Sequence, residues 1–474
     1  MSVLTRLEVD GFKNLFDLEV DFGPYTCIAG PNAVGKSNVF DVIEFLAMIA
    51  DLPFMEAAQR LREAGTRPGE ASTLFWFDKN NVPAPMKIAV EMIVPKSVVD
   101  DFGVLAHPSS TFLRYEIELA YVMPSSDATN RFGGIRLVRE DLNYISQADA
   151  RSRLAWIGKN PRFRDELIRN RRRSTGYIST QETPAGVVFQ VHQDGGSRGL
   201  PRRSALAPKT VLSTTNTIDD PTILAARREM QQWRKLALEP TAMRSPDSVV
   251  GSSTIGPNGS HLAGALFRME QKTRADVDED IYSEVAATAS ALTDVRALEV
   301  DFDATRDLLT LQARLGAGNF LPARSLSDGT LRFLALSIIA ADDEFEGLIC
   351  MEEPENGIHP AKIGAMVDLL KQLAVDPTEP IGDGNPVRQV IVNTHSPRFV
   401  VGQALDDLLL AIPRSLMRDG EEIRSLDLIP MSGSWRKSKS GYAASKALIG
   451  DYLVQPDDSL LELDYPEREM RSLD

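Results

Sequence analysis

Residues 30–37 constrain the fold of this chain more than any other segment. Their sequence, GPNAVGKS, matches the pattern G-x-x-x-x-G-K-[ST] at every fixed position. An apolar run at residues 25–29 precedes the match, and a helix-like run at residues 38–50 follows it. Glycines let successive backbone N–H groups point into one hollow, and the start of a helix adds positive potential there. The segment predicts a strand–loop–helix unit that holds the phosphates of a nucleotide, with an ordinary glycine-rich turn as the alternative.

Two side chains of this loop are suited to specific contacts. Lys36 can reach the outer phosphates, and the hydroxyl of Ser37 can bind Mg²⁺. The residues predicted to line the nucleotide are Asn32, Ala33, Val34, Gly35, Lys36, Ser37 and Asn38.

Three later segments narrow the kind of nucleotide site. Residues 326–332 (LSDGTLR) form a polar turn that opens a helix, residues 348–354 (LICMEEP) an apolar strand that ends in two carboxylates, and residues 390–396 (VIVNTHS) a strand that ends in Thr and His. Taken singly, they are typical of a helix N-cap, a solvated acidic pair and a structural histidine. In this order, after a phosphate loop, they resemble the signature, the Walker B strand and the switch histidine of ABC-class ATPases.

The resemblance implies a role for each polar residue. Glu352 would lie near Mg²⁺, Glu353 would orient or deprotonate the attacking water, and His395 would contact the γ-phosphate or that water. Adjacent side chains at the end of a strand diverge, so the two carboxylates can divide these tasks. Ser327 and Gly329 match the signature positions that, in the family, bind the γ-phosphate of a nucleotide held by another subunit. The resemblance therefore implies a homodimer, or a higher even oligomer, with ATP and Mg²⁺ between subunits.

A finer resemblance is to the SMC/RecF-type branch. It rests on residues 7–15 (LEVDGFKNL), 352–360 (EEPENGIHP) and 393–397 (NTHSP), which are similar to AAA-type ATPases of the OLD (overcoming lysogenization defect) family. The resemblance covers about residues 1–50 and 255–415. Full OLD proteins carry a C-terminal Toprim nuclease, and the residues after His395 lack its acidic pattern, so we expect no nuclease here. Glu352 stands where most ABC proteins have Asp, and no Q-loop glutamine can be assigned.

The fold class expected is α/β: an ABC-type P-loop ATPase head with a mixed central sheet, a flanking antiparallel sheet and a helical or irregular insertion. Alternating runs at residues 85–94, 112–123 and 134–138 predict the antiparallel sheet. Further strands are expected at residues 297–302 and 308–313, and helices at residues 161–173, 221–238 and 276–292. We divide the chain into an N-terminal ATPase lobe (1–150), a basic insertion (151–255), a C-terminal ATPase lobe (256–415) and a partner-binding extension (416–474).

Composition suggests an intracellular location. No run of eighteen apolar residues is present, so neither a membrane span nor a membrane partner is expected, and we expect a cytoplasmic protein. The only two cysteines, Cys27 and Cys350, fall in expected core strands and are interpreted as buried small hydrophobic residues.

The charge of the chain is distributed unevenly. The formal net charge is −15, which argues against non-specific nucleic-acid binding, yet residues 151–209 contain 13 Lys/Arg and only 4 Asp/Glu. At their centre lie Arg169, Arg171, Arg172 and Arg173, with aromatic residues nearby at 156, 163 and 177. Three interpretations stay open: binding to a DNA or RNA backbone, docking on a partner or on an acidic patch of the chain itself, and a plain solvated surface.

Three functions fit these patterns. The first is an ATPase that dimerises on ATP and serves as sensor or motor subunit of a bacterial nucleic-acid-linked complex, such as anti-phage defence, with a separately encoded nuclease or toxin as effector. The second is a RecF-like repair or recombination ATPase that binds DNA directly. The third is an ATP-dependent scaffold that cages a toxic partner.

Overall fold

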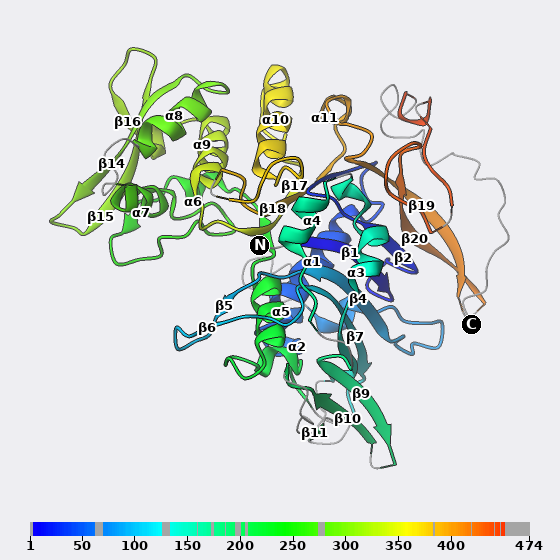
Figure 1. Ribbon diagram of the computed structural model, residues 1–474. Helices are drawn as coiled ribbons and strands as arrows, with labels where there is room; N and C mark the ends of the chain where they lie inside the picture. Colours follow the sequence, from blue (N-terminus) through cyan, green and yellow to red (C-terminus); the bar gives the residue numbers. More distant parts are fainter. Residues whose placement is uncertain are drawn as a thin grey trace.

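The chain folds around two large sheets, with a smaller lobe at one side (Figure 1). The computed structural model describes residues 3–61, 70–125, 133–158, 160–171, 175–184, 186–194, 201–203, 207–273, 280–382, 384–418, 420–439, 441–445 and 447–450.

A six-stranded sheet carries the phosphate loop. Its strand order is β12-β17-β18-β3-β19-β20, and all pairings are parallel except that of β19 with β20. The carboxyl ends of parallel strands meet at one edge, so the segments that follow β3, β17 and β18 come together there. The strands are β3 (Tyr25–Ala29), β12 (Arg234–Leu236), β17 (Gly347–Glu352), β18 (Arg388–Thr394), β19 (Leu408–Arg418) and β20 (Glu421–Pro430).

This sheet is buried on both faces. In β17, Leu348 and Cys350 join the core shared with α1 and the antiparallel sheet, whereas Ile349 and Met351 join the core shared with α9 and α10. Successive side chains of a strand point to opposite faces, so a strand covered on both sides contains a near-continuous apolar run. This explains the continuous apolar runs of the sequence. Cys27 is also buried and, like Cys350, is a free thiol, as predicted.

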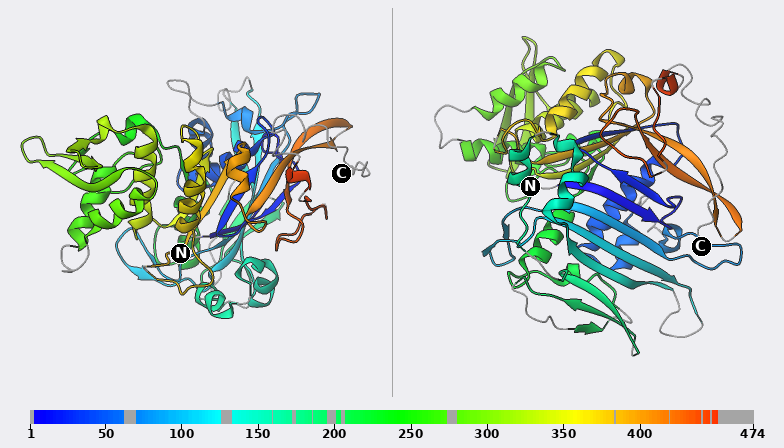
Figure 2. Two further views of the ribbon diagram at one scale, coloured as in Figure 1. Left: turned by 90° about the horizontal axis from the view of Figure 1, so that it is seen from above. Right: turned by 45° about the vertical axis from the view of Figure 1, so that its right-hand side comes forward.

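The second sheet is antiparallel and flanks the first (Figure 2). Its order is β11-β10-β9-β8-β7-β4-β1-β2. The predicted strands at residues 85–94 and 112–123 are confirmed as β4 and β7, and the strand predicted at residues 134–138 continues to Tyr144 as β8. The bounds are β1 (Val3–Asp10), β2 (Leu18–Asp21), β4 (Met86–Ile93), β7 (Phe112–Val122), β8 (Gly134–Tyr144), β9 (Ile178–Thr183), β10 (Gly186–Val191) and β11 (Pro201–Arg203), with a separate hairpin of β5 (Val98–Val99) and β6 (Leu105–Ala106).

The smaller lobe precedes β17 in the chain and packs helices on a four-stranded sheet (Figure 1). The strands predicted at residues 297–302 and 308–313 are confirmed as β14 and β15. The lobe's last helix, α9, begins immediately after Ser327, within the predicted signature. The elements are α6 (Pro240–Met243), β13 (Asp247–Ser248), α7 (Leu262–Thr273), α8 (Ile281–Ser290), β14 (Val295–Asp303), β15 (Leu308–Leu315), β16 (Phe320–Pro322) and α9 (Asp328–Ala341).

Several helix predictions were too long. The helix expected over residues 221–238 ends at Gln231, and residues 234–236 form β12 instead, because their backbone pairs with β17. The helix expected over residues 161–173 ends at Leu167. Besides those of the smaller lobe, the helices are α1 (Lys36–Ile49), α2 (Phe54–Arg60), α3 (Gln147–Arg153), α4 (Pro161–Leu167), α5 (Pro221–Gln231), α10 (Ile363–Leu373) and α11 (Pro397–Val401).

Segments outside the two proposed ATPase lobes also contribute to the sheets and core. Strands β9 and β10, within residues 151–255, extend the antiparallel sheet, and β20, beyond residue 415, pairs with β19. Ala444 and Leu448 are buried in the core of α9 and α10. Among the described residues, no helix combines the length and the apolarity needed to cross a membrane.

Candidate nucleotide site

The phosphate loop connects β3 to α1 with an unusual backbone. Gly35, directly before α1, has φ of +107°, and Ala33 has φ of +64°. Asn32 and Ala33 are exposed at the tip of the loop, whereas Lys36 is buried. The Nζ atom of Lys36 donates to the carbonyl oxygens of Gly30 and Pro31, both at 2.6 Å. The ammonium is therefore held inside the curl of the loop, where a phosphate would compete with these carbonyls for it.

Asn14, in the N-terminal lobe, forms hydrogen bonds with the phosphate loop and with the start of α1. Its Nδ2 donates to the carbonyl of Val34 at 3.1 Å, and its Oδ1 accepts from Nδ2 of Asn38 at 2.6 Å. Asn14 belongs to the N-terminal run at residues 7–15, whose sequence pattern predicts no role for this side chain. It connects the loop and the start of α1 to the segment after β1.

Gly35→Ala is expected to abolish nucleotide binding and to destabilise the chain by more than about 1 kcal/mol. A Cβ at Gly35 would lie 2.4 Å from Nδ2 and 2.6 Å from Oδ1 of Asn14, in addition to the cost of a positive φ. Gly103→Ala is a matched control, since φ there is +79° and nothing lies within 4 Å of the added Cβ. Thermal unfolding and ATP titration of both variants would test this, and equal losses in the two would contradict it.

Ser37 and the first Walker B carboxylate are in contact. The hydroxyl of Ser37 donates to Oε2 of Glu352 at 2.8 Å. The other carboxylate oxygen of Glu352, Oε1, lies 2.8 Å from Nζ of Lys235 on β12. Lys235 was missed because its segment was predicted to be helical, and nothing in its sequence spacing relates it to Glu352.

Glu353 and His395 also meet, at the ends of β17 and β18. Nδ1 of His395 lies 2.7 Å from Oε1 of Glu353, and Nδ2 of Asn356 donates to Oε2 of Glu353 at 2.6 Å. The backbone of Glu353 has φ of +45°, and its N–H donates to the carbonyl of Asn393 at 3.0 Å. Such left-handed backbone costs energy in a residue with a side chain and is often found at functional sites. Both oxygens of Glu353 are thus oriented by polar partners, of which Asn356 was not predicted.

Three carboxylates of the site act on the buried ammonium of Lys36. Burial lowers the pKa of Lys36 to about 8, and this lowering is opposed by the negative charges of Glu353, Glu355 and Glu352. Burial raises the pKa of Glu355, whose Oε1 accepts a hydrogen bond from the Thr394 hydroxyl. The region is rich in negative charge, and burial keeps the pKa of Lys36 below its ordinary value despite that charge.

The signature residues lie at the start of α9. The hydroxyl of Ser327 accepts from the backbone N–H of Thr330 at 3.2 Å, so it is the N-cap of the helix, and it is exposed. An added Cβ at Gly329 would come no closer than 3.9 Å to the carbonyl of Gly357, which leaves its outer side open. Arg332, one turn into α9, donates to the carbonyl of Asn356. The signature helix is thus linked to the segment that orients Glu353.

The donors at this site fit a magnesium–nucleotide complex. In such sites Mg²⁺ is bound by a hydroxyl and a carboxylate group of the protein together with phosphate oxygens and water. Ser37 and Glu352 supply that set, whereas the described residues contain no group of three or more His, Cys, Asp or Glu side chains that could hold a metal alone. The backbone curl around Gly35 and the buried ammonium of Lys36 fit the phosphates.

The basic region is only partly a free surface. Arg169 and Arg171 follow α4, where their backbone N–H groups donate to Thr111 Oγ1 and to the carbonyl of Ser109 at 2.8 Å each. Arg172 and Arg173 lie outside the described residues. The aromatic residues of the region are buried and cannot stack on bases: Trp156, Phe163 and Tyr177.

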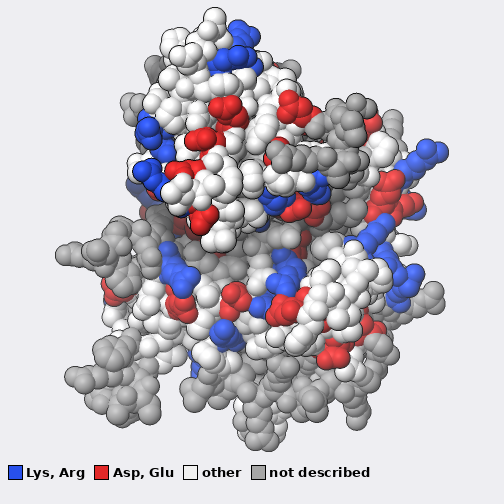
Figure 3. Space-filling view, turned by 90° about the vertical axis from the view of Figure 1, so that its left-hand side faces the viewer, with Lys and Arg blue, Asp and Glu red and all other residues white. Residues whose placement is uncertain are grey.

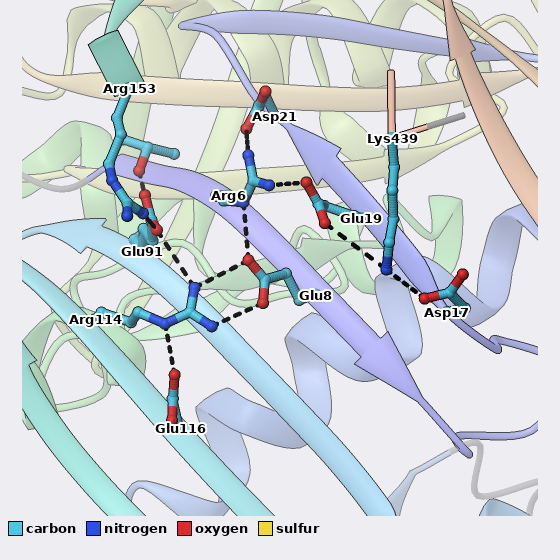
Figure 4. A network of polar contacts seen from close by, with 11 residues as sticks. Arg6, Glu8, Asp17, Glu19, Asp21, Glu91, Arg114, Glu116, Arg153 and Lys439 are labelled. Atoms are coloured by element: carbon cyan, nitrogen blue, oxygen red, sulfur yellow. Dashed lines mark hydrogen bonds and ion pairs between the residues drawn. The ribbon is translucent and has the colours of Figure 1, made fainter. Parts of the chain in front are cut away.

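Part of the positive charge of the basic region is paired with carboxylates of the same chain. Arg153 on α3 pairs with the buried carboxylate of Glu91, which also pairs with Arg114 (Figure 4). Burial raises the pKa of Glu8, but hydrogen bonds from Arg114 and Arg6 outweigh this and bring it to about 2. This network covers the antiparallel sheet with paired charges. On the side of the smaller lobe, Lys/Arg and Asp/Glu are likewise interspersed over the described surface, with a hollow beneath the lobe (Figure 3).

Several heads of SMC proteins are among the solved structures to which this chain is similar. The chain is similar to the SmcHead bound to the C-winged helix domain of ScpA, with 14% identity, 90% of this chain and 98% of that chain covered, and a TM-score of 0.45. It is similar to the SMC head domain from Thermotoga maritima, with 13% identity, 90% and 99% coverage, and a TM-score of 0.36. It is also similar to an Smc head domain with an extended coiled coil from Pyrococcus furiosus, bound to the C-terminal domain of ScpA, with 13% identity, 91% and 97% coverage, and a TM-score of 0.42. No curated protein matches the chain.

A family model gives the clearest relationship. The family described as "AAA domain, putative AbiEii toxin, Type IV TA system" matches residues 124–401. The matched residues include the signature, the Walker B strand and the switch strand, and the phosphate loop precedes them. The α/β fold combines a P-loop, a mixed sheet that is mostly parallel and a flanking antiparallel sheet, which is consistent with a P-loop ATPase of the AAA-domain type. Since the match spans more than half of the chain, this protein belongs to that AAA-domain family.

Proposed function

We propose that this protein binds and hydrolyses ATP with Mg²⁺ and that two copies close around the nucleotides. One observation carries the proposal: at the carboxyl ends of three neighbouring parallel strands, Ser37 contacts Glu352 at 2.8 Å and His395 contacts Glu353 at 2.7 Å. This is the minimal arrangement for holding a metal–triphosphate and for activating a water molecule beside it.

The chain's own groups divide the work of hydrolysis. The backbone of residues 32–38 and the ammonium of Lys36 bind the phosphates. Ser37 and Glu352 would hold Mg²⁺, which neutralises phosphate charge when bound. Glu353 accepts a proton from water as the water oxygen bonds to the γ-phosphorus, and the bond from that phosphorus to the β–γ bridging oxygen breaks. The products are ADP and inorganic phosphate, and His395 and Asn356 keep the carboxylate of Glu353 oriented.

The exposure of the signature residues supports the proposed dimer. Ser327 is exposed at the N-terminus of α9, a 14-residue helix whose positive end suits an anion. Gly329 is open beside it. We propose that both contact the γ-phosphate of ATP bound by a second copy, which makes nucleotide the bridge between subunits.

We further propose that the ATPase serves as the sensor or motor subunit of a bacterial defence complex in the cytoplasm, of the OLD type, with a separately encoded effector. The family's description names a toxin and a toxin–antitoxin system, which supports a role in a system of more than one component. Direct DNA binding through residues 169–173 is the weaker proposal, because the aromatic residues of that region are buried and Arg153 is paired with Glu91.

The pH dependence of ATP affinity tests the site. Burial lowers the pKa of Lys36 to about 8, so above that pH the free protein loses the ammonium that binds phosphate. ATP binding is then coupled to proton uptake, and the affinity is expected to fall about tenfold between pH 7 and pH 9. Equilibrium binding of a fluorescent ATP analogue at constant ionic strength measures this.

Lys36→Ala provides the control. The variant should bind ATP more weakly at pH 7 and show little change up to pH 9, because the titrating group is gone. If Lys36→Ala binds ATP as tightly as the parent chain, the phosphate loop has been assigned wrongly.

A further inference from the structure

Lys235 places a second ammonium beside Glu352, the carboxylate proposed to bind Mg²⁺. It lies on β12, the edge strand beside β17, where it is level with Cys350, two residues before Glu352. Its Nζ lies 2.8 Å from Glu352 Oε1, 3.4 Å from Asp41 Oδ1 and 3.8 Å from Glu44 Oε2. Asp41 is fully buried on α1. The ammonium is therefore fixed by carboxylates from two elements and is not a mobile surface lysine.

This contact leaves Glu352 with one oxygen for a metal. Oε1 is bound to Lys235, whereas Oε2 accepts the hydroxyl hydrogen bond of Ser37. For both oxygens of Glu352 to bind a metal ion, Oε1 would have to give up its contact with the Lys235 ammonium, which Asp41 and Glu44 also hold in place. Lys13 strengthens this arrangement, since its Nζ lies 2.6 Å from the other oxygen of Asp41 and keeps that carboxylate in place.

The number of oxygens that Glu352 can provide affects whether Mg²⁺ or Ca²⁺ binds better. Mg²⁺ requires six ligands at about 2.0–2.1 Å and is satisfied by single oxygens and water, whereas Ca²⁺ takes six to eight at about 2.3–2.6 Å and often binds both oxygens of a carboxylate. On the basis of the ATP site proposed above, we infer that Lys235 restricts Glu352 to one-oxygen coordination and thereby makes nucleotide binding selective for Mg²⁺ over Ca²⁺. Lys235 is a positioning residue in this role, because it acts on the metal through Glu352.

The test compares the two ions in the full-length chain. The dissociation constant of the non-hydrolysable ATP analogue AMP-PNP is measured with saturating Mg²⁺ and with saturating Ca²⁺. The wild-type chain should bind the analogue more tightly with Mg²⁺. In Lys235→Met, the ratio of the Ca²⁺ to the Mg²⁺ dissociation constant should fall about tenfold, as expected when an outer-shell partner is lost. A purely structural role for Lys235 would change both constants together and leave the ratio unaltered.

Two further variants sharpen the result. Lys235→Arg, which keeps a cation beside Glu352, should retain most of the selectivity. Lys272→Met removes a lysine that pairs with Glu344 at 3.4 Å, away from the site, and should change nothing.

Two results would overturn the inference: an unchanged ratio in folded Lys235→Met, or equal binding with both ions in the wild-type chain, which needs no variant. Absence of AMP-PNP binding with either ion would instead refute the proposed ATP site itself.

Discussion

Glu353→Gln is expected to reduce the rate of ATP hydrolysis at least about 100-fold while leaving ATP affinity close to that of the parent chain. Glutamine has the shape of glutamate and can keep polar contacts with Asn356 and His395, which lie 2.6 and 2.7 Å from the carboxylate oxygens. It cannot accept the proton of the attacking water at neutral pH. Phosphate release at saturating ATP and equilibrium ATP binding measure the two quantities separately.

The neighbouring carboxylate gives the matched control. Glu352 contacts Ser37 rather than His395, so Glu352→Gln should raise the Mg²⁺ concentration needed for ATP binding. Glu353→Gln should leave that concentration unchanged. Hydrolysis at the parent rate in Glu353→Gln would mean that Glu353 is not the base, and a shifted Mg²⁺ requirement in that variant would exchange the two roles.

The residues of this site differ in how far sequence could predict them. Ser37, Glu352, Glu353 and His395 each belong to a short motif at the end of a buried strand, and motif order alone assigns them to one edge of a sheet. The structure places them together, through the contacts of Ser37 with Glu352 and of His395 with Glu353. Motif order carries no information on which additional side chains reach that edge from elsewhere.

Lys235 shows why the other residues of the site could not be predicted from the sequence. It is more than one hundred residues from Glu352 in the chain, and its position depends on β12 pairing with β17. Residues 221–238 have a helical pattern throughout, and only the tertiary contact of the last part with an exposed strand edge overrides it. Asn14 differs, because it lies within a recognised N-terminal pattern, although its contact with the phosphate loop required the structure.

Strands could be predicted from the sequence where their burial determines the order of apolar and polar residues. The doubly covered strand β17 contains a continuous apolar run, and in β7 buried residues alternate with half-exposed ones, so both kinds of strand were predicted. The strand β20 was missed, since its sequence, EEIRSLDLIP, mixes charges with apolar residues. Its burial depends on pairing with β19 at the edge of the sheet.

Mixing two inactive chains is expected to restore about one quarter of the parent ATPase activity. Lys36→Ala removes the phosphate-binding ammonium, and Ser327→Arg places a long cation at the exposed N-cap of α9, so each chain alone should lose at least about 100-fold. If nucleotide is held between the phosphate loop of one copy and the signature of another, random pairing gives half mixed dimers, each with one intact site. Phosphate release is measured after the two chains have been allowed to exchange subunits without nucleotide.

This experiment distinguishes a shared site from a site within one chain, because the two intact residues lie on different chains of the mixed dimer. In every mixed dimer the only complete site combines Lys36 from the Ser327→Arg chain with Ser327 from the Lys36→Ala chain. A site built within one chain would contain one defect in every copy, so the mixture would stay as inactive as its components. Thr305→Arg, an exposed position in the β14–β15 turn of the same lobe, should stay fully active and shows that an added arginine is tolerated there. A mixture without recovered activity, formed from chains that do exchange, would refute the shared site even if the parent chain binds and hydrolyses ATP.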